Sequence, residues 1–155
     1  MCKIVPFQRH HQDGVVFAVK DVFDEYGFTW EADGYCRDLY NVEKHYSEPG
    51  GMFWAVLDGE QVIGCAGLRW HGEECELHRM YLTKRYRGRG LGRRLLETCM
   101  DCARERGCTS MRAWSDTTLV DAHRLYEKLG FVRGGRRICD DPDQSPEYGF
   151  WKEPL

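Results

Sequence analysis

The sequence lacks the features of a membrane protein or a secreted one. No apolar run approaches the ~18 residues of a membrane-spanning helix. The first ten residues contain no apolar signal-peptide segment. We therefore expect a cytoplasmic protein that does not act on a membrane. The chain also lacks internal repeats, low-complexity tracts and linkers, so its 155 residues predict one domain, residues 1–155.

An excess of positive charge is missing as well. The chain has 22 Lys and Arg residues against 25 Asp and Glu residues, which gives a formal net charge of −3. This balance argues against general nucleic-acid binding, even though arginine is locally concentrated. An RNA-binding protein is therefore a disfavoured alternative, and no nucleic-acid partner is expected.

The eight cysteines do not form a metal-binding pattern. Cys99 and Cys102 make the only C-x-x-C pair, and they fall inside a helical pattern. No second pair or nearby histidine completes a ligand set. We expect no metal, and cysteines that are mostly reduced and pack as small core residues.

Residues 76–96 combine positive charge with glycine, in the order ELHRMYLTKRYRGRGLGRRLL. A half-apolar segment, Glu76–Leu82, precedes a basic glycine-rich turn and then an amphipathic helix. Free backbone N–H groups and the helix dipole make such a helix N-terminus an anion site, which glycine lets a ligand approach closely. The six cations around the turn are Lys84, Arg85, Arg87, Arg89, Arg93 and Arg94. A phosphate ligand is therefore predicted, although a solvated charged loop is the alternative.

Two common phosphate-binding loops do not fit this turn. A Walker loop ends in Gly-Lys-Ser/Thr, whereas Gly92 is followed by Arg93 and Arg94. The Rossmann fingerprint needs G-x-G-x-x-G at the opening of a βαβ unit. Here the glycines follow a G-x-G-x-G pattern after several expected strands, so that interpretation is weak.

The segment Arg87-Gly88-Arg89-Gly90-Leu91-Gly92 matches the pattern Q/R-x-x-G-x-G/A. It resembles the first signature of the GNAT superfamily of CoA-dependent N-acetyltransferases. The segment AHRLYEKLGF, residues 122–131, resembles that family's second signature. The order of expected elements also agrees along nearly the whole chain.

Hydrophobic periodicity and turn residues predict an α/β chain with one central sheet and helices on both faces, and the resemblance implies that this mixed sheet is mostly antiparallel. The expected strands are Lys3–Phe7, Met52–Leu57, Gln61–Trp70, Cys75–Leu82, Thr109–Trp114, Phe131–Ile138 and Glu147–Lys152. The expected helices are Val15–Tyr26, Tyr35–Tyr46, a third from the glycine-rich turn to about Arg106, and Leu119–Leu129.

The resemblance implies where acetyl-CoA binds. The sheet of the family splays between its fourth and fifth strands, and the pantetheine arm pairs with the fourth strand. In this chain that strand contributes Met80, Tyr81 and Leu82. The backbone of the turn would hold the pyrophosphate, with Arg85, Arg87 or Arg93 as charged helpers. The turn residues are Arg87, Gly88, Arg89, Gly90, Leu91 and Gly92.

The resemblance also implies direct attack of an amine on acetyl-CoA in a ternary complex. Glu76 is the leading candidate for the base, and His78 is the second. Strand alternation predicts that Glu76, His78, Met80 and Leu82 share one face. Tyr126 matches the family tyrosine that protonates the departing thiolate, although a core aromatic residue is the alternative.

The acceptor is less defined. Residues 21–35 carry five acids and several aromatic side chains with no Lys or Arg, which favours a cationic amine. Such an amine could belong to a small molecule, a lysine side chain or a peptide N-terminus; a solvated acidic face is the alternative. Candidate contacts are Glu25, Tyr26, Trp30 and Asp116.

Two further points come from the resemblance. Many family members carry Asn three residues before the motif alanine, where this chain has Leu119. The alternative to an enzyme is a catalytically silent CoA-binding module. Family members often form homodimers, but nothing in this sequence defines an interface.

Overall fold

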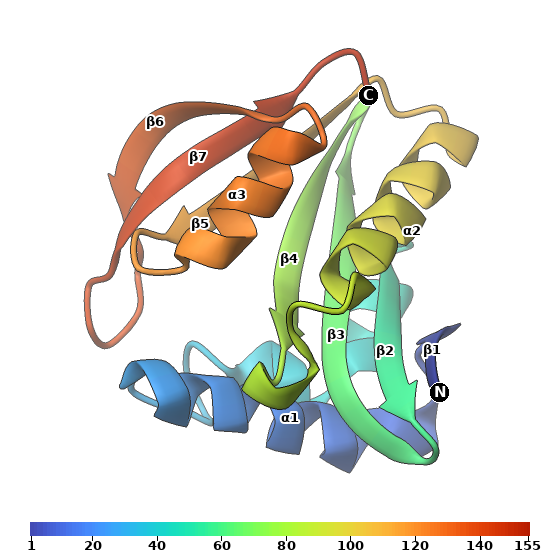
Figure 1. Cartoon of the computed structure of the whole chain (residues 1–155), viewed down its shortest axis with the longest axis vertical. Helices are drawn as coiled ribbons and strands as arrows, with labels where there is room; N and C mark the ends of the chain where they lie inside the picture. The colour runs from blue at the N-terminus through green and yellow to red at the C-terminus, as the bar shows by residue number, and fades with distance from the viewer.

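Seven strands form one sheet in the computed structural model, which describes all 155 residues (Figure 1). The strand order is β1-β2-β3-β4-β5-β7-β6. The strands are β1 (Cys2–Pro6), β2 (Met52–Asp58), β3 (Gln61–His71), β4 (Glu74–Leu82), β5 (Ser110–Asp116), β6 (Val132–Ile138) and β7 (Pro146–Lys152). The helices are η1 (Arg9–His11), α1 (Gln12–Tyr26), η2 (Arg37–Tyr40), η3 (Glu43–Ser47), η4 (Lys84–Tyr86), α2 (Leu91–Glu105) and α3 (Val120–Lys128).

The sheet opens between β4 and β5, as the family resemblance implies. These two strands are the only parallel neighbours, and they pair only from Glu74 with Ser110 to Leu77 with Ala113. Beyond this point β5 continues beside β7, while the rest of β4 has no partner on that side. Figure 1 shows the two strands together at their upper ends and apart at their lower ends. The free edge of β4 is therefore available to a ligand.

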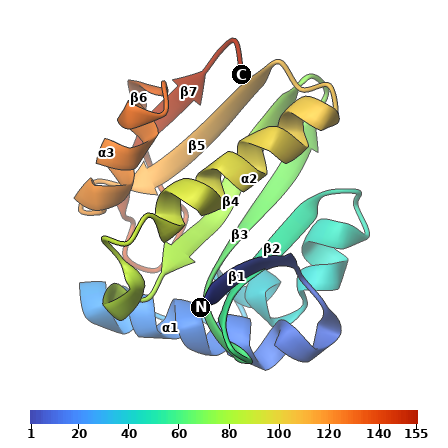
Figure 2. The same cartoon turned by 45° about the vertical axis from the view of Figure 1, so that its right-hand side comes forward.

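Helices cover both faces of the sheet, which confirms the predicted fold class (Figure 2). The apolar side of α2 packs with Tyr126 of α3 into a core cluster of 20 buried residues. The apolar side of α1 and the segment 36–46 pack on the opposite face in a cluster of 12 buried residues. Burial of these faces is the main favourable contribution to folding.

The predicted helix Tyr35–Tyr46 is only partly correct, because the segment forms the short 3-10 helix η2 and the π-helix η3 in place of one continuous helix. Asn41, between them, has an extended backbone with φ −152°. Tertiary contacts compete with helical hydrogen bonds here, since the side-chain amide of Gln12 accepts from the Val42 N–H and donates to the Leu39 carbonyl. Leu39 and Val42 are still fully buried. The spacing of these two residues therefore predicted their burial correctly but a continuous helix incorrectly.

A β-bulge in β4 overturns the prediction that Glu76, His78, Met80 and Leu82 share one face. Gly67 pairs with His78 and Cys65 pairs with Tyr81, so β4 contains one extra residue at this point. Arg79 adopts φ +52°, a left-handed conformation that is uncommon for a side chain of this size. After the bulge the alternation reverses. Met80 and Leu82 pack on the α2 side, and Tyr81 packs on the α1 side.

None of the helices combines the length and apolar character needed to cross a lipid bilayer. All eight cysteines are free thiols, and six of them are buried. No group of three or more His, Cys, Asp and Glu side chains has the arrangement of a metal site.

Candidate active site

The glycine-rich turn ends in a helix N-terminus with unpaired donors. Gly88 and Gly90 have φ values of +75° and +82°, a conformation that glycine adopts without steric cost. The first helical hydrogen bond of α2 runs from the Arg94 N–H to the Gly90 carbonyl. The N–H groups of the three preceding residues therefore have no helical partner. Because the first turn contains no acidic residue, it suits an anion.

A groove of about 500 Å³ lies beside this helix N-terminus. Its walls come from the free edge of β4, the glycine-rich turn, α1 and α3. The groove is lined by Val22, Tyr26, Met80, Tyr81, Leu82, Arg87, Gly88, Gly90, Gly92, Arg93, Leu119, Asp121, Ala122, Leu125 and Lys128. Most of the residues that the sequence assigned to acetyl-CoA thus lie together. Arg85 lies outside this lining and contributes to a separate hollow beside α1.

Lys128 is a cation of the groove that the sequence analysis missed. It stands at the end of α3, 36 residues after Gly92, so no local pattern connects it with the turn. Lys128 reaches the groove only because α3 packs beside it.

Arg87 is held in place by two elements. Its guanidinium makes two hydrogen bonds of 2.7 Å with the carboxylate of Glu25, and Nε donates to the Leu82 carbonyl at 3.0 Å. A paired guanidinium keeps its donors largely occupied. Glu25, which the sequence suggested as an acceptor contact, thus fastens the turn to α1.

A second cavity of about 370 Å³ lies between β4, β5 and the segment 34–45. It shares three lining residues, Met80, Tyr81 and Leu119, with the groove. The two hollows therefore meet where β4 and β5 separate. A ligand that lies along β4 in the groove can reach the second cavity at this point.

Tyr126 lines the second cavity although its helix also borders the groove. Its side chain is buried, with the ring 5.1 Å from Phe150 and 5.6 Å from Phe131. Burial, and to a lesser degree Tyr81 and Cys99, raises the pKa of the phenol. The hydroxyl therefore stays protonated at neutral pH and can act as a proton donor.

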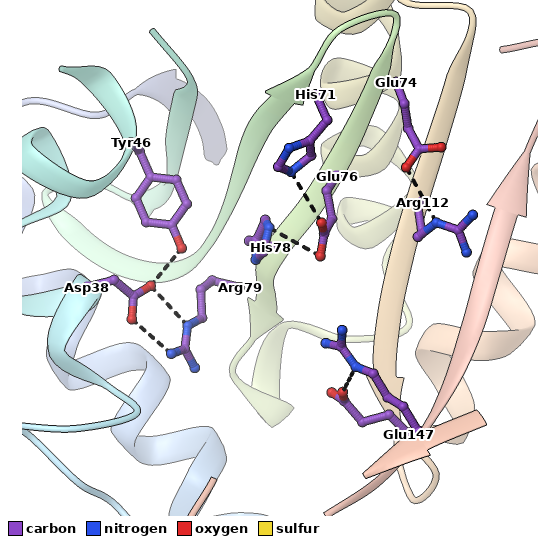
Figure 3. Close-up of polar contacts among 10 residues, drawn as sticks. Asp38, Tyr46, His71, Glu74, Glu76, His78, Arg79, Arg112 and Glu147 are labelled. Carbon is purple, nitrogen blue, oxygen red and sulfur yellow. Dashed lines mark hydrogen bonds and ion pairs between the residues drawn. The ribbon is translucent and has the colours of Figure 1, made fainter. Parts of the chain in front are cut away.

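Glu76 and His78 both line the second cavity, as neighbours on β4 (Figure 3). The Oε1 of Glu76 lies 3.4 Å from Nε2 of His78, and its Oε2 lies 3.4 Å from Nε2 of His71. Burial, then the charges of Arg69 and Arg79, lowers the pKa of His78 to about 3. His78 is therefore neutral at physiological pH, and its contact with Glu76 is not an ion pair.

Arg79, at the bulge, lies in a polar network that the sequence analysis missed (Figure 3). Its Nε and Nη2 donate to the two carboxylate oxygens of Asp38, at 3.1 Å and 2.8 Å. Nη2 also donates to the Tyr35 carbonyl, and the hydroxyl of Tyr46 donates to Asp38 at 2.6 Å. Burial alone would raise the pKa of Asp38, but Arg79 outweighs it and holds that pKa low.

The other suggested acceptor residues are divided among several places. Tyr26 borders the groove and stacks on Phe28. The indole N–H of Trp30 donates to the hydroxyl of Tyr40 at 3.0 Å, and Trp30 borders neither hollow. Asp116 lines the second cavity, where it accepts hydrogen bonds from the backbone and the hydroxyl of Thr118.

The fold has many relatives among solved structures. An acetyltransferase of the GNAT family from Staphylococcus aureus Mu50 covers 100% of both chains with a TM-score of 0.87 at 20% identity. A PaiA N-acetyltransferase from Thermoplasma acidophilum, solved in complex with coenzyme A, covers 99% of both chains with a TM-score of 0.78 at 17% identity. At these identities the likeness establishes the fold.

Sequence comparison extends the likeness to the family. The N-acetyltransferase YjgM of Escherichia coli (strain K12) is 38% identical over 124 residues, which span 73% of this chain and 71% of that protein. The N-acetylaspartate synthetase of Homo sapiens is 37% identical over 102 residues, 63% of this chain but only 33% of that protein. The model of the Acetyltransferase (GNAT) family matches residues 19–131. The chain therefore belongs to the GNAT family of acetyltransferases and is an acyltransferase.

Proposed function

We propose that this protein moves an acetyl group from acetyl-CoA to a primary amine by direct attack in a ternary complex. The observation that carries the proposal is the meeting of two hollows where β4 and β5 separate. One hollow has the helix N-terminus with unpaired donors, and the other has Glu76 and the protonated Tyr126. A thioester at the junction would face both groups.

The groove fits acetyl-CoA in its shape and its charge. The N–H groups at the start of α2, with Arg93 and Lys128 nearby, would hold the pyrophosphate. The unpaired edge of β4 from Met80 to Leu82 would pair with the pantetheine amides as an added strand does. The donors of Arg87 are occupied by Glu25, so Arg87 would hold the turn in place rather than bind phosphate.

In the proposed reaction the amine nitrogen forms a bond to the thioester carbon, and the carbon–sulfur bond breaks. An amine must lose a proton to attack, and Glu76 would accept it directly or through a water molecule. Tyr126 would donate its proton to the departing thiolate, and solvent would restore it. A backbone N–H of β4 would stabilise the negative charge that develops on the carbonyl oxygen.

Glu76 is better suited than His78 to act as the base. A base is most effective when its pKa lies near the working pH, and the pKa of His78 is lowered to about 3. Glu76 faces the cavity without an arginine within ion-pair distance, so its charge remains available to an amine.

The acceptor expected from the sequence was cationic, because residues 21–35 are acidic. The structure gives this expectation little support, since none of the five acids of that segment lines the second cavity and Glu25 is paired with Arg87. The product in the name of the N-acetylaspartate synthetases is an N-acetylated amino acid. Amino acids therefore belong beside polyamines, aminoglycosides and a lysine peptide in any set of test acceptors.

The test is incubation of the protein with acetyl-CoA and this set of acceptors, with products read by mass spectrometry because free thiols disturb thiol-release dyes. The wild type is compared with Tyr126→Phe and with Tyr148→Phe, a tyrosine on β7 outside both hollows. A general acid contributes about 10²–10⁴-fold, so Tyr126→Phe should lose about that much of kcat. Tyr148→Phe should retain activity.

Binding of acetyl-CoA, measured by calorimetry, should be similar in all three proteins. Acetyl-CoA binding without any acetylated product would refute the proposal in favour of a silent CoA-binding module. Equal loss of activity in both tyrosine variants would remove the acid role from Tyr126.

A further inference from the structure

The second cavity contains the only two buried side-chain polar atoms of the protein that have no hydrogen-bond partner. They are Nε2 of His78 and Nη1 of Arg79, on consecutive residues at the bulge of β4. Buried polar atoms are nearly always paired, so these two call for an explanation, such as a bound molecule or ion that pairs with them. Two hydrogen-bonding groups of the cavity wall around the bulge therefore remain without a partner.

Arg79 is held in place by its neighbours, and one nitrogen of its guanidinium has no hydrogen-bond partner. Asp38 and the Tyr35 carbonyl occupy Nε and Nη2, and the guanidinium lies 4.4 Å from the Tyr35 ring. The side chain is 9% exposed, so it cannot swing out to solvent without breaking these contacts. Its remaining nitrogen, Nη1, is the one without a partner.

Arg69 adds a second positive charge at the same wall. Its guanidinium lies over the ring of Tyr46 at 4.3 Å, and no carboxylate lies within 4.0 Å of it. Its charge reaches the bulge, because after burial Arg69 is the next cause of the lowered pKa of His78. Asp38 forms an ion pair with Arg79 and none with Arg69, so Arg69 offers the cavity a guanidinium without an ion-pair partner.

Glu76 provides the opposite charge next to Arg69. The two residues are direct partners in the pairing of β3 with β4, and both line the cavity. Cross-strand partners have Cβ atoms about 5 Å apart, so the two charged groups can face one ligand side by side. They do not form an ion pair with each other, because Glu76 contacts His71 and His78 instead (Figure 3).

We propose that the acceptor is an amine that also carries a carboxylate, which Arg69 binds with support from Arg79 while Glu76 faces the amine. Because Arg69 and Glu76 are cross-strand partners that line one cavity, the guanidinium and the carboxylate can contact the two ends of one amino acid. This inference rests on the acetyl transfer proposed above. It names the acceptor class and assigns Arg69 and Arg79 to the binding of its anionic end.

The test compares each standard L-amino acid with its own α-amide, which keeps the amine and removes the negative charge. We expect a kcat/KM for the best amino acid about tenfold or more above that of its amide, because a hydrogen bond between charged groups contributes more than a neutral one. Arg69→Gln should remove this preference, and Arg69→Lys should retain part of it. Arg104→Gln is the control, since Arg104 pairs with Asp101 on α2 and lies outside the cavity.

Calorimetry with coenzyme A bound gives a readout without turnover. The wild type should bind the same amino acid more tightly than its amide, and Arg69→Gln should bind both equally. If no acceptor is acetylated but this binding preference persists, the proposed function fails and the carboxylate site stands. Equal use and equal binding of acids and amides, or a preference that survives in Arg69→Gln, would overturn the inference.

Discussion

Breaking the ion pair between Asp38 and Arg79 from one side should destabilise the protein strongly, and Asp38→Ala tests this. The side chains of Arg79 and Asp38 are 9% and 12% exposed, so the substitution leaves a buried guanidinium without its carboxylate. Breaking a buried pair from one side costs about 3–5 kcal/mol. For a chain of this length, about 2–4 °C of Tm is lost per kcal/mol, so a decrease of about 10 °C is expected.

Three further variants separate the causes of this loss. Tyr46→Phe removes only the 2.6 Å hydrogen bond to Asp38 and should cost less, about 1.5–3 kcal/mol. Glu97→Ala removes the exposed pair with Arg93 and should cost no more than about 0.5 kcal/mol. The double variant Asp38→Ala with Arg79→Met should recover part of the loss, because the uncompensated charge is then gone.

The assay is urea unfolding followed by circular dichroism at several pH values. Arg79 holds the pKa of Asp38 below its usual range, so the stabilisation is present above the unfolded pKa of ~3.9 and is lost as the pH falls through the folded pKa. The difference between wild type and Asp38→Ala should therefore shrink below about pH 4. An Asp38→Ala protein that unfolds within about 0.5 kcal/mol of wild type at pH 7 would refute the reasoning.

Three other predictions concern the site. Glu76→Gln should reduce kcat by about 10²-fold or more with acetyl-CoA binding unchanged, whereas an unchanged kcat would remove Glu76 as the base. Because the pKa of His78 is lowered to about 3, the unfolded chain binds a proton below ~6.5 that the folded protein excludes. Stability should thus fall with decreasing pH in this range, by up to about 1.4 kcal/mol per pH unit, and His78→Gln should flatten the slope in urea titrations. Gly90→Ala forces a side chain into a φ of +82° and should cost about 1–2 kcal/mol and weaken acetyl-CoA binding in calorimetry; wild-type affinity would show that the turn tolerates the change.

Much of the candidate site was predictable because its signals are local. The glycine-rich turn, the start of α2 and the second motif in α3 each lie within about ten neighbouring residues; the turn and the helix start line the groove, and Tyr126 lines the second cavity. The strands were predictable for the same reason, since alternation and turn residues act over short distances. The expected strands agree with the observed ones to within one or two residues at most ends.

The charges of the second cavity depend on contacts between distant residues. Arg79 and Asp38 are 41 positions apart, and Arg87 and Glu25 are 62 apart. The acids of residues 21–35 suggested a cationic acceptor, but none of them lines the second cavity, and Glu25 is paired with Arg87. No periodicity in the sequence indicates which carboxylate a given arginine meets.

The sequence by itself determined the family, the order of the elements and the glycine-rich turn before α2, because these follow from short-range geometry and composition. Only the tertiary structure decided the bulge at Arg79, the faces of β4, the break between the short helices η2 and η3, and the unpaired arginine nitrogen in the cavity. Each of these depends on which distant groups meet in the buried interior. There, burial and charge pairing outweigh local backbone preference.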